Sequence, residues 1–106
     1  MKFTGLVYED VSLDEYNYEV LDAVVTDTRI AIDWDENGEP YHLKARSTNG
    51  VTYNGNYGTP RPNSQWHMEL TRYSSRDGCE LLIGEWNERD SGSTGMCVFE
   101  LEPDAL

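Results

Sequence analysis

Apolar and polar residues alternate along most of this chain, in short segments separated by turn-forming residues. Alternation with a period of two is typical of strands that bury one face. The pattern predicts eight strands: Phe3–Tyr8, Tyr18–Val25, Arg29–Trp34, Tyr41–Arg46, Val51–Tyr57, Gln65–Tyr73, Glu80–Trp86 and Met96–Leu101. Between them, Asn37-Gly38, Asn49-Gly50 and Asp77-Gly78 are pairs of residues that favour tight hairpin turns.

The segment of residues 12–24 supports two interpretations. Ser12 and Glu15 have the spacing of a helix capping box, and apolar residues follow at helical intervals. The high content of Tyr and Val instead favours a strand. We therefore expect a loop or helical turn near Ser12–Tyr16 and a strand from about Tyr18 to Val25, with a helix as the alternative.

Glycine recurs beside aromatic residues inside the expected strands. Gly84 lies between Leu82 and Trp86, and Gly55 lies between Tyr53 and Tyr57. A glycine in mid-strand weakens the strand unless a bend, a bulge or a neighbouring ring needs the space. The pattern indicates a strongly curved sheet.

Short links between successive strands favour an up-and-down meander. A meander of about eight strands that closes has no free edge and encloses room for side chains or one small ligand. The chain is long enough for one modest core. We therefore predict an all-β fold, a single antiparallel up-and-down barrel domain that spans residues 1–106.

With this meander and its Gly84-Glu85-Trp86 segment, the chain resembles the small calycin-type barrels, the group that includes lipocalins and avidins. Those families carry a Gly-x-Trp in an early strand, whereas here it falls in the seventh. The resemblance implies a binding scaffold. It transfers no ligand-binding residue to this sequence.

The charge is strongly negative and uneven. The formal net charge is −12, of which residues 1–39 contribute −9 and residues 40–106 contribute −3. Such a chain is repelled by nucleic acids and anionic membranes and attracts a basic protein surface. The expected acidic docking surface consists of Glu9, Asp10, Asp14, Glu15, Glu19, Asp22, Asp27, Asp33, Asp35, Glu36 and Glu39.

Two functions fit these features. The first is a non-catalytic module that docks on a basic protein partner, as an inhibitor, an immunity protein or a mimic of nucleic acid would. The alternative is a small-molecule-binding barrel with an aromatic interior. Its expected ligand contacts are Trp34, Tyr53, Tyr57, Trp66 and Trp86. A hollow interior would favour the alternative, and a filled one would not.

A cation site is a weak alternative within one predicted turn. The residues Asp33, Asp35, Asn37 and Gly38 match the first half of a calcium-binding loop. Lys44 occupies the twelfth position, where that loop needs a glutamate. We therefore expect a hairpin turn with acids on its solvent side, and no cofactor.

Catalysis is not expected. The candidate acids and bases are Glu69, Glu85, His42 and His67, and alternation places all four opposite the apolar faces of their strands. No nucleophile motif or phosphate-binding loop is present in the sequence.

Two cysteines and the start of the chain indicate a cytoplasmic protein. A hairpin centred near Ser91 places Cys97 opposite about Glu85 and far from Cys79, so two thiols are expected. The first residues do not have the pattern of a secretion signal, and no apolar run is long enough to span a membrane.

Overall fold

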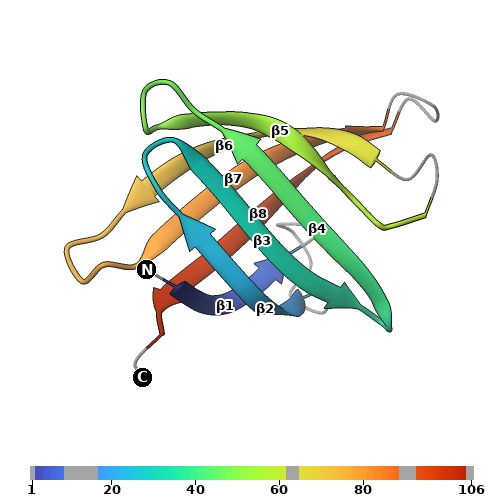
Figure 1. The fold of residues 1–106 in the computed structure, drawn as a ribbon, viewed down its shortest axis with the longest axis horizontal. Coiled ribbons are helices and arrows are strands. Elements are labelled where there is room, and N and C mark those ends of the chain that lie inside the picture. Colours follow the sequence, from blue (N-terminus) through green and yellow to red (C-terminus); the bar gives the residue numbers. More distant parts are fainter. Residues whose placement is uncertain (1, 9–16, 62–64, 89–92, 105–106) are drawn as a thin grey trace.

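The computed structural model describes residues 2–8, 17–61, 65–88 and 93–104. They form eight strands: β1 (Lys2–Tyr8), β2 (Asn17–Val25), β3 (Arg29–Glu36), β4 (Glu39–Arg46), β5 (Thr52–Gly58), β6 (Gln65–Ser74), β7 (Glu80–Glu88) and β8 (Ser93–Pro103). Each strand pairs antiparallel with the next, and β8 pairs with β1, so the sheet closes into a barrel (Figure 1). The prediction of an all-β, up-and-down, eight-stranded barrel is confirmed. None of the described residues forms a helix that could cross a membrane.

Most predicted strands agree with the structure, with small differences at their ends. The strand at Tyr18–Val25 is confirmed, while Ser12–Tyr16 lies outside the described residues. The predicted strand Val51–Tyr57 begins one residue too early, because Val51 precedes β5 and is half exposed in the turn.

The pairing of β7 with β8 differs by one residue from the predicted register. Glu88 pairs with Ser93, so Cys97 lies opposite Gly84 rather than Glu85. Gly84 and Cys97 therefore share the inner face of the barrel.

Alternating side chains fill the barrel as the sequence pattern requires. The buried core takes residues from all eight strands: Phe3, Val7, Val20, Ala23, Val25, Ile30, Ile32, Trp34, Leu43, Ala45, Tyr53, Tyr57, Met68, Leu70, Leu82, Cys97, Phe99 and Leu101. The alternation is interrupted in β2, where the register shifts between Val20 and Asp22. This bulge turns Leu21 outward, and Leu21 is 64% exposed.

Two glycines allow neighbouring strands to approach closely enough for the barrel to curve. A Cβ atom on Gly55 would lie 1.9 Å from the carbonyl oxygen of Lys44 in β4. A Cβ atom on Gly5 would lie 1.8 Å from the carbonyl oxygen of Glu100 in β8. Because backbone, rather than a flexible side chain, occupies this space, both positions need glycine. The inference from recurrent glycine to a closed, curved sheet is thereby explained.

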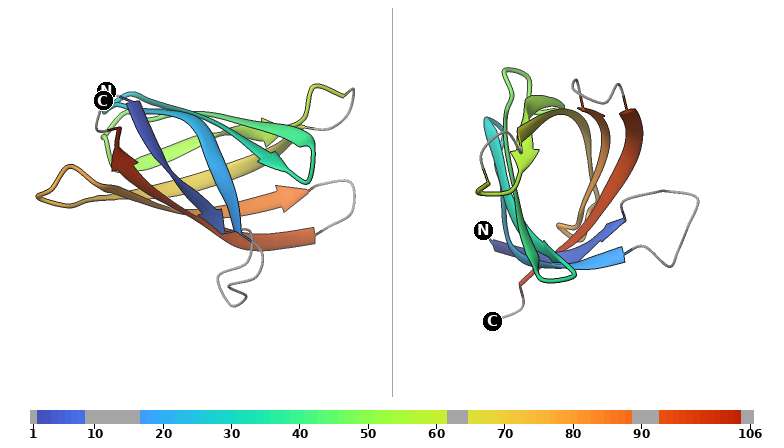
Figure 2. Two further views of the ribbon diagram at one scale, coloured as in Figure 1. Left: turned by 90° about the horizontal axis from the view of Figure 1, so that it is seen from below. Right: turned by 90° about the vertical axis from the view of Figure 1, so that its right-hand side faces the viewer.

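The two ends of the barrel differ. We call the end where β3, β5 and β7 finish and β4, β6 and β8 begin, which carries the β3–β4 turn, the cavity end. We call the other end, where the described termini and the β2–β3, β4–β5 and β6–β7 turns lie, the terminal end (Figures 1 and 2). In the right-hand view of Figure 2 the strands encircle a single interior, seen from the cavity end.

Candidate binding site at the cavity end

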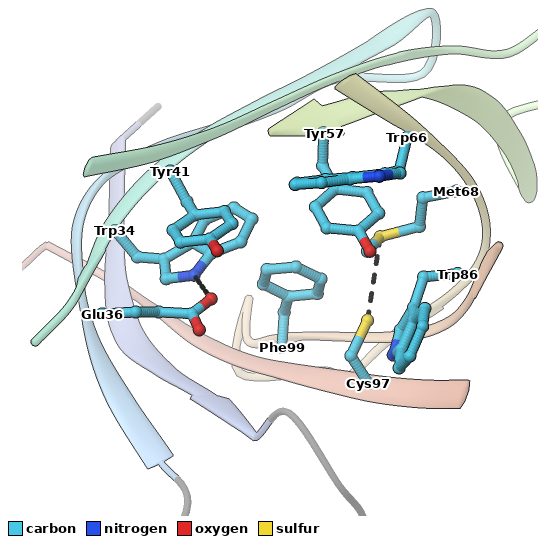
Figure 3. A pocket seen from close by; sticks show the side chains of 9 residues that line it. All are labelled: Trp34, Glu36, Tyr41, Tyr57, Trp66, Met68, Trp86, Cys97 and Phe99. Atoms are coloured by element: carbon cyan, nitrogen blue, oxygen red, sulfur yellow. Dashed lines mark hydrogen bonds between the residues drawn. The ribbon is translucent and has the colours of Figure 1, made fainter. Parts of the chain in front are cut away.

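A small cavity lies inside the barrel at the cavity end (Figure 3). Its volume is about 60 Å³. Pockets for drug-sized ligands usually measure about 300–1,000 Å³. It is lined by Trp34, Glu36, Tyr41, Tyr57, Trp66, Met68, Trp86, Cys97 and Phe99. The chain's own side chains therefore fill most of the interior, which argues against a large apolar ligand.

Aromatic pairs across neighbouring strands build the walls of the cavity. Trp34 of β3 pairs with Tyr41 of β4, and their rings stack with centroids 5.7 Å apart. Tyr57 of β5 pairs with Trp66 of β6, with ring centroids 5.5 Å apart. Cross-strand pairs of this kind stabilise a sheet beyond simple burial. Phe99 lies below them, with its ring edge-on to Trp34.

Glu36 supplies the one carboxylate among the described residues that line the cavity. It follows Ile32 and Trp34 on the inner face of β3, and its side chain is half-buried. The indole Nε1 of Trp34 donates a hydrogen bond of 2.8 Å to Glu36 Oε2 (Figure 3). This bond holds the carboxyl group of Glu36 against the aromatic wall.

Gly84 leaves room for two sulfur atoms on the opposite wall. A Cβ atom at Gly84 would lie 2.9 Å from Cys97 Sγ and 3.3 Å from Met68 Sδ. Without that atom, the two side chains meet above β7, and Cys97 Sγ donates to Met68 Sδ at 3.7 Å. The glycine singled out in the sequence is thus needed for side-chain packing inside the barrel.

The two cysteines should differ in reactivity. Both are free thiols, but Cys97 is only 3% exposed whereas Cys79 is partly exposed near the terminal end. Because a thiol must reach solvent to react, we expect a chromogenic disulfide reagent to modify one thiol rapidly in the folded protein. Cys79→Ser should remove the rapid phase and Cys97→Ser should retain it. A rapid phase that survives in Cys79→Ser would contradict the buried position of Cys97.

Four of the five aromatic residues expected to contact a ligand line the cavity: Trp34, Tyr57, Trp66 and Trp86. Tyr53 lies elsewhere. It is completely buried toward the terminal end, where its hydroxyl donates to the carbonyl oxygen of Thr26 at 2.6 Å. Tyr53 is therefore part of the structure that closes the barrel rather than of the cavity wall.

The expected ligand contacts did not include five other residues that line the cavity: Glu36, Tyr41, Met68, Cys97 and Phe99. The signal was available, because Glu36 continues the inward alternation of Ile32 and Trp34. A charged residue at an inward position close to the end of a strand was interpreted only as part of the acidic surface.

An ionic cluster closes the terminal end. Arg72 continues the inward face of β6, and Glu80 begins the inward face of β7. The guanidinium of Arg72 makes two parallel hydrogen bonds to the Glu80 carboxylate, of 3.0 Å from Nε and 2.8 Å from Nη2. Arg72 Nη1 also donates to Asp27 and to the Tyr53 hydroxyl. Ser74 donates a further hydrogen bond to Glu80.

Burial and hydrogen bonding shift the pKa of Glu80 in opposite directions. Burial alone would raise the pKa of its carboxyl, since Glu80 is 6% exposed. The hydrogen bonds from Arg72 and Ser74 outweigh burial and hold the pKa of Glu80 below its ordinary value. The hydrogen bond to Glu80 raises the pKa of Arg72. Both groups are therefore charged at neutral pH, as a closed polar cluster inside the barrel requires.

The structure engages much of the predicted acidic surface in contacts within the chain. Asp27 bonds Arg72 at 3.0 Å, and Asp33 bonds the Nδ1 atom of His42. Asp35 accepts a hydrogen bond of 2.6 Å from the backbone of Gly38.

The remaining eight acids of that predicted surface fall into four groups. Glu36 bonds Trp34 inside the cavity, and Glu39 lies 3.2 Å from Arg61 in an ion pair. Glu19 and Asp22 are exposed on the outer face of β2. The other four, Glu9, Asp10, Asp14 and Glu15, lie outside the described residues.

The residues of the calcium-like turn contact different partners. Asp33 contacts His42, Asp35 caps the turn, and Asn37 adopts a positive φ of 55° next to Gly38. Within the described ranges, His, Cys, Asp and Glu form no group of three that could hold a metal ion. The hairpin-turn interpretation of this segment is confirmed.

The candidate catalytic acids and bases do not converge on the cavity. Glu69 and Glu85 face each other across β6 and β7 on the outer surface, where both are exposed. His67 is also exposed, and His42 is half-buried beside Asp33. The sequence pattern predicts that these four residues lie opposite the apolar faces of their strands, and none of them belongs to the buried core.

Comparison with known proteins provides no relative, since no protein-family model, curated protein or solved structure matches the chain. The strand number and topology are compatible with a calycin-type barrel.

Proposed function

We propose that this protein is a non-catalytic, acidic binding module that docks on a basic protein partner through the cavity end. One observation carries the proposal: the rim that presents Asp35, Glu36 and Glu39 also holds the partly exposed rings of Tyr41 and Trp66. Aromatic side chains are enriched where proteins bind each other, and charges around them select the partner.

The net charge acts at longer range than the rim. A charge of −12 on 106 residues attracts a basic surface and increases the rate of encounter at low ionic strength. An inhibitor, an immunity protein or a mimic of nucleic acid on a cytoplasmic calycin-like scaffold would use this attraction. The small cavity makes a dedicated carrier of large apolar ligands the weaker candidate.

The location of the docking surface can be tested with two variants of equal charge. One carries Asp35→Asn, Glu36→Gln and Glu39→Gln at the cavity end. The other carries Glu69→Gln, Glu85→Gln and Glu102→Gln on the outer face, where all three are exposed. Each immobilised protein is used to capture partners from its source cell at low salt, followed by elution in salt steps.

We expect the wild type and the outer-face variant to retain a basic protein that moderate salt releases. The cavity-end variant should lose this basic protein, because its three charges are removed from the docking rim itself, whereas the outer-face variant loses three charges elsewhere. Equal loss in both variants would mean that only the net charge matters. A captured partner that is not basic, or whose binding does not depend on salt, would contradict the proposal.

A further inference from the structure

A groove crosses the outside of the barrel, where β3, β4 and β5 are neighbours in the sheet (Figure 1). We call it the outer groove, and its volume is about 440 Å³. Its lining includes six residues that alternate with core residues along their strands: Arg29, Ala31, Lys44, Arg46, Asn54 and Asn56. It shares no lining residue with the cavity inside the barrel.

Positive charge gathers in the outer groove. Arg29 and Arg46 lie directly opposite each other in the pairing of β3 with β4, and Lys44 lies on the same face of β4. All three side chains are exposed, and none makes an ion pair with another residue in the described part of the chain. The described lining contains no Asp or Glu, although the whole chain has 20 acids and only 8 Lys and Arg residues.

This arrangement works against the stability of the protein on its own. Like charges directly opposite each other on paired strands repel. The next acid along the same face of β3 is Asp33, but it bonds the Nδ1 atom of His42. Positions that bind a ligand are often ones where stability is given up. The opposed arginines therefore indicate that an anion occupies the outer groove.

The net charge of the chain limits the size of this anion. Fields from distant acids are screened over about 8 Å at physiological ionic strength, so the three nearby cations dominate inside the groove. A long polyanion extends beyond them and meets the repulsion of a chain with a net charge of −12. The outer groove therefore favours a small anion over a nucleic acid.

The types of cation favour a phosphate ester over a carboxylate. The planar guanidinium fork of arginine donates paired hydrogen bonds to phosphate oxygens, and lysine adds a point charge. A phosphate monoester carries a charge of about −1.5 to −2 at neutral pH and three strong acceptor oxygens. Two guanidinium groups and one ammonium group neutralise such a group more completely than they would a single carboxylate.

The outer groove has room for more than the phosphate. Its volume of about 440 Å³ lies within the usual range of small-molecule pockets, about 300–1,000 Å³. The side-chain amides of Asn54 and Asn56 lie beside the cations, and each can donate and accept hydrogen bonds, as hydroxyl groups require. Among the described residues that line it, none has an aromatic ring on which a nucleobase could stack.

We infer that the outer groove binds a sugar phosphate, a small phosphate monoester with a hydroxylated and non-aromatic body. Arg29 and Arg46 hold the phosphate group, and Lys44 adds to their charge. Asn54 and Asn56 contact the hydroxyl groups. The inference does not rest on the proposed function, because the outer groove lies apart from the cavity and its rim.

Nuclear magnetic resonance of the full ¹⁵N-labelled chain tests this inference with glucose 6-phosphate, inorganic phosphate and glucose, all at one ionic strength. The side-chain amide signals of Asn54 and Asn56 report on the groove directly. We expect saturable shifts of these signals with glucose 6-phosphate, affinity for inorganic phosphate weaker by about threefold or more, and no saturable shift with glucose.

A matched pair of variants separates the groove from the overall charge. Arg46→Gln removes one charge from the groove, and Arg76→Gln removes one from an exposed turn outside it. We expect Arg46→Gln to weaken the binding of glucose 6-phosphate by about tenfold and Arg76→Gln to change it by less than about twofold. Without ligand, Arg46→Gln should unfold at a higher urea concentration than Arg76→Gln, because only Arg46→Gln relieves the repulsion from Arg29.

Four results would each overturn the inference. They are the absence of saturable shifts with glucose 6-phosphate, equal affinity for glucose 6-phosphate and inorganic phosphate, equal loss of binding in both variants, and lower stability of Arg46→Gln than of Arg76→Gln. Equal affinity would mean that the groove attracts an adventitious ion only. None of these results bears on the capture of a basic partner at the cavity end.

Discussion

Replacing Glu80 with alanine is expected to lower the free energy of unfolding by about 3–5 kcal/mol, because it removes the two hydrogen bonds that hold the Arg72 charge inside the barrel and leaves Arg72 only the exposed carboxylate of Asp27. Arg72 has a side chain that is only 16% exposed, so water cannot replace the lost carboxylate. Denaturation in urea, followed by far-UV circular dichroism, measures the change. Glu85→Ala, also in β7 but exposed on the outer face, should change stability by no more than about 0.5 kcal/mol.

The same cluster predicts how stability depends on pH. The pKa of Glu80 is lower in the folded protein than its ordinary value of 4.5, so the unfolded chain binds the proton more readily. The contribution of Glu80 to the free energy of unfolding is therefore complete above about pH 4.5. This contribution is lost as the pH falls through the pKa that Glu80 has in the folded protein. Glu80→Gln should flatten this part of the stability profile. An unchanged acid profile in that variant would contradict the role of the Arg72–Glu80 pair.

Replacing Gly55 with alanine is expected to have the second large effect, a loss of about 3 kcal/mol or more of stability. The added Cβ atom would overlap the Lys44 carbonyl oxygen, and backbone yields less readily than the side chains involved in ordinary overpacking. The strands β4 and β5 would have to separate at this point. Chemical denaturation and the near-UV circular dichroism of the aromatic core measure the outcome.

Asn54→Ala is the control for Gly55→Ala, because Asn54 is the neighbouring residue on β5 and is exposed. It should leave both measurements nearly unchanged. A Gly55→Ala variant as stable as the wild type would show that the barrel can relax around the added atom. The glycine would then not be needed for closure.

Most of the fold could be predicted from the sequence, because short strands, hairpin turns and period-two alternation act locally. Asn37-Gly38 formed the expected turn, with positive φ at both residues. The bulge that exposes Leu21 was not predicted, since it depends on how β2 meets both neighbours. The shift that places Cys97 opposite Gly84 likewise depends on the β7–β8 register, which the turn sequence alone did not determine.

The site was harder to predict because charged residues were assumed to face water. Arg72 and Glu80 lie on the inner face of their strands, in step with Leu70 and Leu82, and alternation alone would have placed them inside. They are tolerated there because their charges pair with each other. Acids that the sequence assigned to the expected docking surface, such as Asp27 and Asp33, also make contacts within the chain that the sequence pattern did not predict.

The closure of β1 on β8 has a practical consequence for the geometry of attachment. Phe3 pairs with Pro103, so the described ends of the chain lie side by side at the terminal end (Figure 1). A tether, a fluorophore or a second domain added at either end therefore extends away from the opposite mouth. The protein can be anchored to a surface by either end in the same orientation, with its aromatic mouth directed toward solution.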